Sequence, residues 1–124
     1  LNFNFKLFNF TNDISEYFLK TELAITRAGS SVTAELINCN IPFISIPYPH
    51  AADSHQEKNA TYFEKKGYSL SIKETEVNEK LFPLIKSFYK DKKLLDKMIE
   101  QQKKHSDKEA FFKINKIIKN LINE

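Results

Sequence analysis

The sequence predicts a single α/β domain with a Rossmann-like parallel sheet flanked by helices. Short apolar runs that suit strands alternate along the chain with longer segments of helical periodicity, which is the order found in parallel sheets. The length of 124 residues fits one domain. Hydrophobic residues make up 41% and charged residues 28%, a balance typical of a folded globular chain.

The first half of the chain predicts a strand–helix–strand–helix–strand order. Apolar and polar residues alternate at the N-terminus, which is the pattern of a half-buried strand. Thr11, Asn12 and Asp13 offer caps for a short helix. In the third strand, Pro42 and Pro47 lie near the ends, where a missing N–H donor is tolerated. The predicted strands are 1–10, 23–26 and 41–46, and the predicted helices are 14–21 and 30–38.

The second half predicts one strand and four helices. Asp53 and Gln56 resemble a capping box that opens a helix ending near Lys66, and Gly67 supplies a stop. The remaining elements are a strand over 68–72 and lysine-rich helices over 78–89, 92–103 and 108–123. The last helix is amphipathic, with an apolar stripe opposite its lysines. This stripe either packs on protein or lies on an anionic membrane surface.

Composition excludes several classes of protein. The formal charge is +3 and the lysines are spread along the second half, so no nucleic-acid footprint is expected. The single cysteine, Cys39, fits a reducing cytoplasm, and we expect it to be a small buried packing residue. The longest apolar stretch, 41–48, is too short to span a bilayer. The first residue is Leu1, and the chain opens directly in a strand-like pattern, so we expect it to begin inside a longer protein.

Two turns are the places to search for a ligand site. In open parallel sheets, ligands bind at the carboxyl ends of the strands, which here are the turns after Thr26 and Ile46. After Thr26 comes Arg-Ala-Gly-Ser-Ser, in which Gly29 lets a ligand approach the backbone. The free N–H groups at the start of the next helix, near 30–32, can then hold an anion such as a diphosphate.

Four side chains near these turns carry alternative interpretations. Glu35 lies one helical turn beyond Ser31, where its carboxylate either accepts hydrogen bonds from a ribose diol or faces water. Gln56 and Asn59 are spaced to present amides to sugar hydroxyls, or else Gln56 completes a cap and Asn59 is a surface residue. Arg27 is the only arginine in the chain, which either indicates a need for a planar guanidinium or arises by chance.

The two turns together resemble the C-terminal donor domain of the MurG family. These enzymes are the UDP-N-acetylglucosamine transferases of peptidoglycan synthesis, in glycosyltransferase family 28. The resemblance runs from about Phe10 to the C-terminus. It is carried by Arg-Ala-Gly-Ser-Ser-Val-Thr-Ala-Glu at 27–35 and Pro-Tyr-Pro-His-Ala-Ala-Asp-Ser-His-Gln-Glu-Lys-Asn-Ala at 47–60. It implies that the chain is the C-terminal half of a two-domain GT-B glycosyltransferase.

The resemblance also implies roles for individual residues. The ribose-binding glutamate of the family falls on Glu35, and its sugar-contacting glutamine and asparagine fall on Gln56 and Asn59. The main chain that reads uracil falls at Thr11. The donor-binding residues implied in this way are Thr11, Arg27, Gly29, Ser30, Ser31, Val32, Glu35, Gln56 and Asn59.

Two departures from the family pattern are visible. The family has Ser-Thr-Val where this chain has Ser31-Val32-Thr33, which displaces a threonine hydroxyl from the phosphates. The resemblance implies that the acceptor and the general base belong to a glycine-rich N-terminal domain, which we do not expect within these 124 residues, so no catalytic base is assigned. His50 and His55 are interpreted as structural residues.

The implied reaction is transfer of N-acetylglucosamine from UDP to a muramoyl sugar on a polyprenyl diphosphate lipid, with inversion. The implied place is the inner face of the bacterial cell membrane, where the full protein is a peripheral cytoplasmic enzyme. No cofactor, metal ion or nucleic acid is expected. Two alternatives stay open: the donor half of a transferase with another acceptor, and a nucleotide-sugar-binding module that requires a separate partner subunit.

Overall fold

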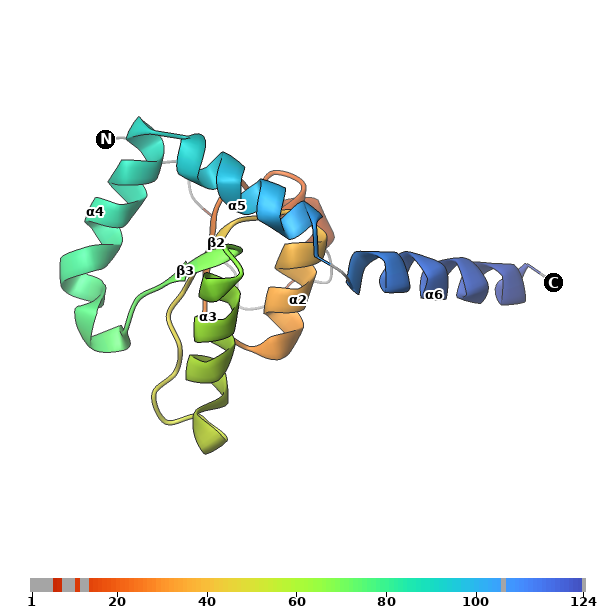
Figure 1. The fold of residues 1–124 in the computed structure, drawn as a ribbon, viewed down its shortest axis with the longest axis horizontal. Coiled ribbons are helices and arrows are strands. Elements are labelled where there is room, and N and C mark those ends of the chain that lie inside the picture. The colour runs from red at the N-terminus through yellow and green to blue at the C-terminus, as the bar shows by residue number, and fades with distance from the viewer. Residues whose placement is uncertain (1–5, 8–10, 12–13, 106, 124) are drawn as a thin grey trace.

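A computed structural model describes residues 6–7, 11, 14–105 and 107–123. Its core is a parallel sheet of three strands in the order β1-β2-β3, with helices on both faces (Figure 1). The strands are β1 (Ala24–Thr26), β2 (Phe43–Ser45) and β3 (Ser69–Ser71). The α-helices are α1 (Ile14–Phe18), α2 (Ser30–Asn38), α3 (His55–Lys65), α4 (Val77–Lys90), α5 (Lys93–Lys103) and α6 (Asp107–Ile122). Two short 3-10 helices, η1 (Ala52–Ser54) and η2 (Glu74–Glu76), precede α3 and α4.

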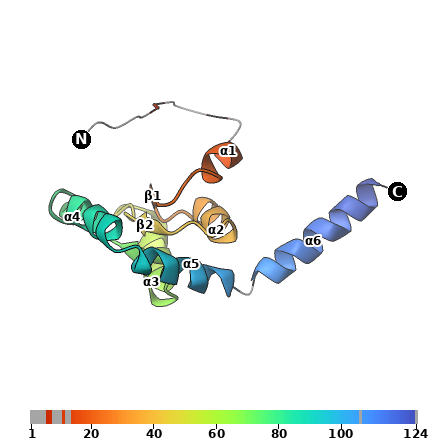
Figure 2. The same ribbon diagram turned by 90° about the horizontal axis from the view of Figure 1, so that it is seen from above.

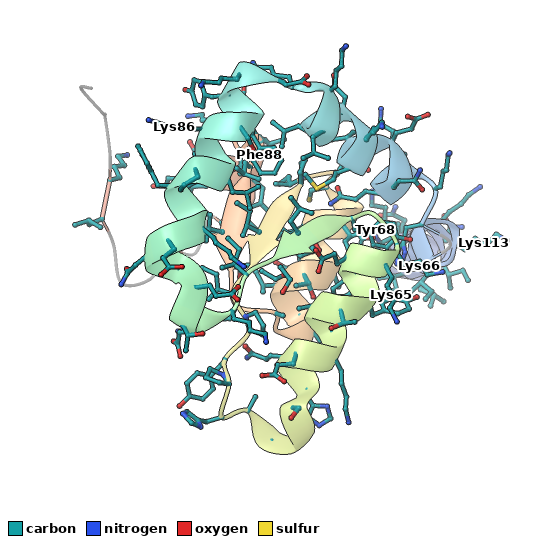
Figure 3. All side chains as sticks on the ribbon, turned by 60° about the vertical axis from the view of Figure 1, so that its left-hand side comes forward. Lys65, Lys66, Tyr68, Lys86, Phe88 and Lys113 are labelled. Carbon is teal, nitrogen blue, oxygen red and sulfur yellow. The ribbon has the colours of Figure 1, made fainter. Side chains whose placement is uncertain are left out.

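The sheet alternates its side chains between two apolar layers. Phe43 of β2 points toward a cluster with Leu36 and Ile37 of α2, and its ring meets Phe63 of α3 edge-on at 6.1 Å between centroids. Ile44, the next residue along β2, points to the other face. There it packs with three other buried side chains, Ile72, Phe88 of α4 and Met98 of α5. Figure 3 labels Phe88 on α4.

The strand register brings the carboxyl ends of all three strands to one edge. Thr26 pairs with Ser45, and Ser45 pairs with Ser71. The loops that follow these residues therefore lie side by side at the carboxyl edge of the sheet.

The opposite edge of the sheet is closed by α5. Gln102, which is fully buried, donates through Nε2 to the carbonyl oxygens of Ile41 and Tyr68, each at 2.9 Å. Tyr68 immediately precedes β3 (Figure 3), and its hydroxyl bonds to Nδ1 of His105 at 2.9 Å. Two strands thus have their amino ends tied to the end of one helix.

The last helix, α6, extends away from the rest of the molecule in both ribbon views (Figures 1 and 2). Its described apolar side chains are exposed: Ile114, Ile117, Ile118, Leu121 and Ile122. Among the described residues, no helix is long and apolar enough to cross a membrane.

The α/β prediction is confirmed, and most elements lie within two residues of their predicted bounds. The predicted strand 1–10 falls outside the described residues, except for Lys6 and Leu7, which have no regular secondary structure. The predicted start of α3 is wrong. The helix begins at His55 after the η1 turn, because Ser54 takes a left-handed conformation with φ of 54° and serves as the N-cap.

Candidate functional site

Arg27 joins the loops that follow the three strands. Its Nη2 donates to Oε1 of Glu74 at 2.7 Å, and its Nη1 donates to the carbonyl oxygen of Ile46 at 3.3 Å. The guanidinium carbon also lies 5.6 Å from the centre of the Tyr48 ring, within range of a cation–π interaction. One planar cation on the loop after β1 therefore contacts residues of the other two loops at the carboxyl edge.

The start of α2 is an open helix N-terminus. Gly29 is its N-cap residue, and no side chain caps the helix there. The first main-chain bond of the helix runs from the Thr33 N–H to the Gly29 carbonyl at 3.2 Å. Ser30, Ser31 and Val32 precede Thr33 in the chain, so their N–H groups have no acceptor within the helix. These three groups lie at the positive end of the helix dipole. This arrangement suits a bound anion.

The fold itself does not require a glycine at position 29. Gly29 has φ of −70° and ψ of 142°, a conformation open to any residue. A Cβ atom built there would lie 4.0 Å from its nearest neighbour, Cγ1 of Val32, which is ordinary van der Waals contact. The lack of a side chain therefore leaves accessible space beside the first turn of α2.

Glu35 lies on the exposed surface of α2, four residues beyond Ser31. Residues four apart share a helix face, so its carboxylate is one turn along from the open N–H groups. Both side chains are exposed to solvent. The spacing on which the prediction for Glu35 depends is therefore present in the structure.

The α3 helix reaches both loops through its amides. Asn59 donates from Nδ2 to the carbonyl oxygen of Ala28 at 3.1 Å, which fixes the residue before Gly29. Gln56 accepts from the N–H of Tyr48 through Oε1 at 2.8 Å, which holds the loop after β2. The Nε2 group of Gln56 carries the donors that a sugar hydroxyl could accept.

Two cavities flank the Arg27–Glu74 pair. The first, of about 490 Å³, is lined by Ile25, Thr26, Arg27, Ile46, Glu74, Val77 and Asn78. The second, of about 360 Å³, is lined by Pro47, Pro49, Glu57, Thr61, Ser71, Lys73, Glu74 and Thr75. Glu74 lines both, whereas Gly29 and Glu35 line neither. In the described part of the chain, no cluster of three or more His, Cys, Asp or Glu side chains could hold a metal ion.

A sequence profile of the glycosyltransferase family 28 C-terminal domain matches residues 1–114. The chain belongs to this family. The resemblance noted from the two turns is thereby confirmed.

Curated relatives of the family 28 domain come from several bacteria. A protein of Pelagibacter ubique is 42% identical over 79 residues, which cover 64% of this chain and 22% of the relative. A protein of Desulfotalea psychrophila is 32% identical over 115 residues, covering 92% of this chain and 31% of the relative. Both are named as UDP-N-acetylglucosamine–N-acetylmuramyl-(pentapeptide) pyrophosphoryl-undecaprenol N-acetylglucosamine transferases. The chain thus spans less than a third of the length of these relatives.

The fold of this family 28 domain is also found in a solved structure. The crystal structure of Acinetobacter baumannii MurG superposes with a TM-score of 0.70 at 21% identity, covering 81% of this chain and 29% of that one. The predicted fold class, one half of a GT-B glycosyltransferase, agrees with this likeness.

The departure from the family pattern at Ser31-Val32-Thr33 has a structural outcome. Thr33 is fully buried, and its hydroxyl donates to the carbonyl oxygen of Gly29 at 2.7 Å and lies 3.2 Å from that of Ser30. The hydroxyl is thus bonded within the first turn of the helix. The main-chain N–H groups at the start of the helix are unaffected by this bond, so their suitability for an anion does not depend on the threonine hydroxyl.

Other sequence predictions have mixed outcomes. Thr11 is half-buried, but its neighbours 8–10 and 12–13 lie outside the described residues, so its uracil-reading role stays a prediction. His50 is exposed, with its ring edge-on to that of Tyr48, and His55 is the exposed first residue of α3.

The prediction that Cys39 is buried is wrong. It is the C-cap residue of α2, where the chain leaves the helix, and its side chain is exposed.

Sequence analysis missed Glu74 and Tyr48 as members of the site. Glu74 lies 47 residues from Arg27, in a stretch without a recognisable motif. The register of three parallel strands brings the two together, and no local pattern reports such a pairing.

Proposed function

We propose that this chain, over residues 1–124, is the donor-binding domain of a transferase that takes N-acetylglucosamine from UDP-N-acetylglucosamine. The acceptor in the proposed reaction is the muramoyl sugar of a lipid-linked peptidoglycan precursor, converted from lipid I to lipid II. The printed names of the relatives, which specify this donor and an undecaprenol-linked acceptor, support the proposal. The acceptor and the catalytic base would lie on a further domain.

The observation that carries the proposal is the open start of α2 beside a glycine that the fold does not require. The diphosphate of UDP would accept hydrogen bonds from the N–H groups at 30–32. Glu35, one turn further along, would accept hydrogen bonds from the ribose hydroxyls. Gln56 and Asn59 would face the sugar, and Thr11 would lie at the uracil.

In the proposed mechanism, this chain stabilises the leaving group, which is UDP. Negative charge grows on the UDP β-phosphate as the glycosidic bond breaks. N–H groups that already point toward this phosphate stabilise the charge without reorganisation, an effect worth several kcal/mol in comparable sites. The acceptor hydroxyl would attack from the side of the further domain and invert the anomeric centre.

The place of action follows from the acceptor. A lipid-linked sugar stays at the membrane, so the full protein would work as a peripheral enzyme at the inner face of the bacterial cell membrane. The exposed stripe and lysines of α6 would either pack on the further domain or contact anionic lipid.

Titration calorimetry of the chain with UDP tests the proposed function. We expect a dissociation constant within the range of about 1 μM to 1 mM that is usual for enzyme substrates. UMP, which lacks the β-phosphate, should bind more weakly than UDP. ADP, which keeps the diphosphate and carries another base, is the control for recognition of the base. The chain alone should show no transfer of N-acetylglucosamine to a lipid-linked acceptor. Absence of UDP binding, or equal binding of UDP and UMP, would contradict the diphosphate site at α2.

A further inference from the structure

The loop that leads into α2 is anchored on both sides. Arg27 is held by Glu74 and by the carbonyl of Ile46, and the next residue, Ala28, is held through its own carbonyl by Asn59. Ala28 is fully buried, so this residue is also fixed by packing. Gly29 and the open N–H groups follow directly, and their position depends on these two anchors.

The Arg27–Glu74 pair is poorly placed to stabilise the fold as a whole. The two side chains are 47% and 43% exposed, and an ion pair at such a surface contributes little to the free energy of unfolding. Its geometry is nevertheless specific. The guanidinium spans a carboxylate after β3 and a carbonyl after β2, which the single ammonium of a lysine does not reproduce. A specific arrangement with little effect on stability indicates a local role.

We propose that Glu74 is a positioning residue of the donor site. By holding the Arg27 guanidinium, it fixes the loop at 27–29 so that the first N–H groups of α2 point at the diphosphate. Glu74 itself does not contact the donor. This inference rests on the proposed function, because UDP is the ligand whose affinity reports the position of the loop.

The direct test is UDP titration of Glu74→Gln against the parent chain. Simple Coulomb attraction predicts that removing a negative charge near the site tightens the binding of an anionic ligand. The positioning role predicts the opposite sign. We expect the dissociation constant to rise about threefold to fivefold, the upper part of the range for exposed ion pairs, with an unchanged thermal midpoint.

Glu76→Gln is the matched control. Glu76 lies two residues further on in the same η2 turn, and its Oε2 pairs with Nζ of Lys80 at 3.0 Å. The hydrogen bond from Lys80 lowers the pKa of Glu76, so this variant also removes a paired negative charge. Because this pair does not reach Arg27, UDP affinity should stay equal or rise slightly.

Two further measurements separate positioning from a general structural effect. Arg27→Lys should weaken UDP binding to a similar degree. The double variant Arg27→Lys/Glu74→Gln should bind UDP no more weakly than either single variant. In the absence of UDP, the amide NMR signals of Gly29, Ser30 and Ser31 should shift in Glu74→Gln and not in Glu76→Gln.

Two outcomes would contradict the inference. If the parent binds UDP and Glu74→Gln binds it equally or more tightly, Glu74 has no positioning role, while the proposed function stands. If the parent does not bind UDP, the proposed function fails, and the inference that rests on it fails as well.

Discussion

Replacing Glu35 with alanine is expected to weaken UDP binding by about 10- to 150-fold, because a hydrogen bond to a charged group is worth roughly 1.5–3 kcal/mol. The carboxylate lies one turn from the open start of α2, where both of its oxygens can accept bonds from a ribose diol. Since the side chain is exposed, the free energy of unfolding should change by less than about 0.5 kcal/mol. Titration calorimetry and thermal unfolding measure the two quantities.

A ligand variant and a protein variant control this experiment. The dideoxy analogue of UDP, which lacks the 2′ and 3′ hydroxyls, should bind the parent and Glu35→Ala with similar affinity, because the contact is absent in both cases. Glu64→Ala removes an exposed carboxylate from α3 and should leave UDP affinity unchanged. Equal UDP affinity in the parent and in Glu35→Ala would remove Glu35 from the site.

Gly29→Ala is expected to weaken UDP binding with little change in stability. The backbone at 29 suits any residue and a Cβ has room there, so the gain of about 0.4–1 kcal/mol through the unfolded state should roughly offset the loss from alanine being a poorer N-cap residue than glycine. A methyl group beside the first turn of α2 would press against a bound diphosphate. Overpacking of this kind costs about 1–3 kcal/mol, which corresponds to a roughly 5- to 150-fold loss of affinity.

Gly67→Ala provides the opposite pattern. Gly67 has φ of 80°, and a Cβ there would lie 3.2 Å from Cγ of Gln101. This variant should therefore lower the thermal midpoint, while UDP affinity stays unchanged. If Gly29→Ala bound UDP like the parent, the space beside Gly29 would not be a phosphate site.

The order of strands and α-helices could be predicted from the sequence because the strands lie in short apolar runs and most α-helices carry a helical periodicity. The residues at which the helices begin and end were less predictable. The start of α3 depends on the left-handed backbone of Ser54, which a side-chain pattern does not report. The exposure of Cys39 likewise depends on the residue at which α2 ends. In both cases local backbone geometry at a helix end overrides the pattern.

The candidate site was predictable where its residues follow one another in the chain. The N–H groups at 30–32, Gly29 and Glu35 belong to a single turn and helix, so their relation follows from helical spacing. Tyr48 meets Arg27 only after β1 and β2 have paired, and Glu74 does so only after β3 has joined the sheet. The bonds of Asn59 to Ala28 and of Gln56 to Tyr48 also depend on this packing.

The bonds from Gln102 affect the order in which the chain can complete its sheet during synthesis. The carbonyls of Ile41 and Tyr68 emerge from the ribosome well before their donor, which follows Ile41 by 61 positions. Until then these two carbonyls lack the Gln102 amide as a donor, and the amino ends of β2 and β3 are not yet tied to α5. A nascent chain that has produced all three strands therefore still needs α5 before that edge closes.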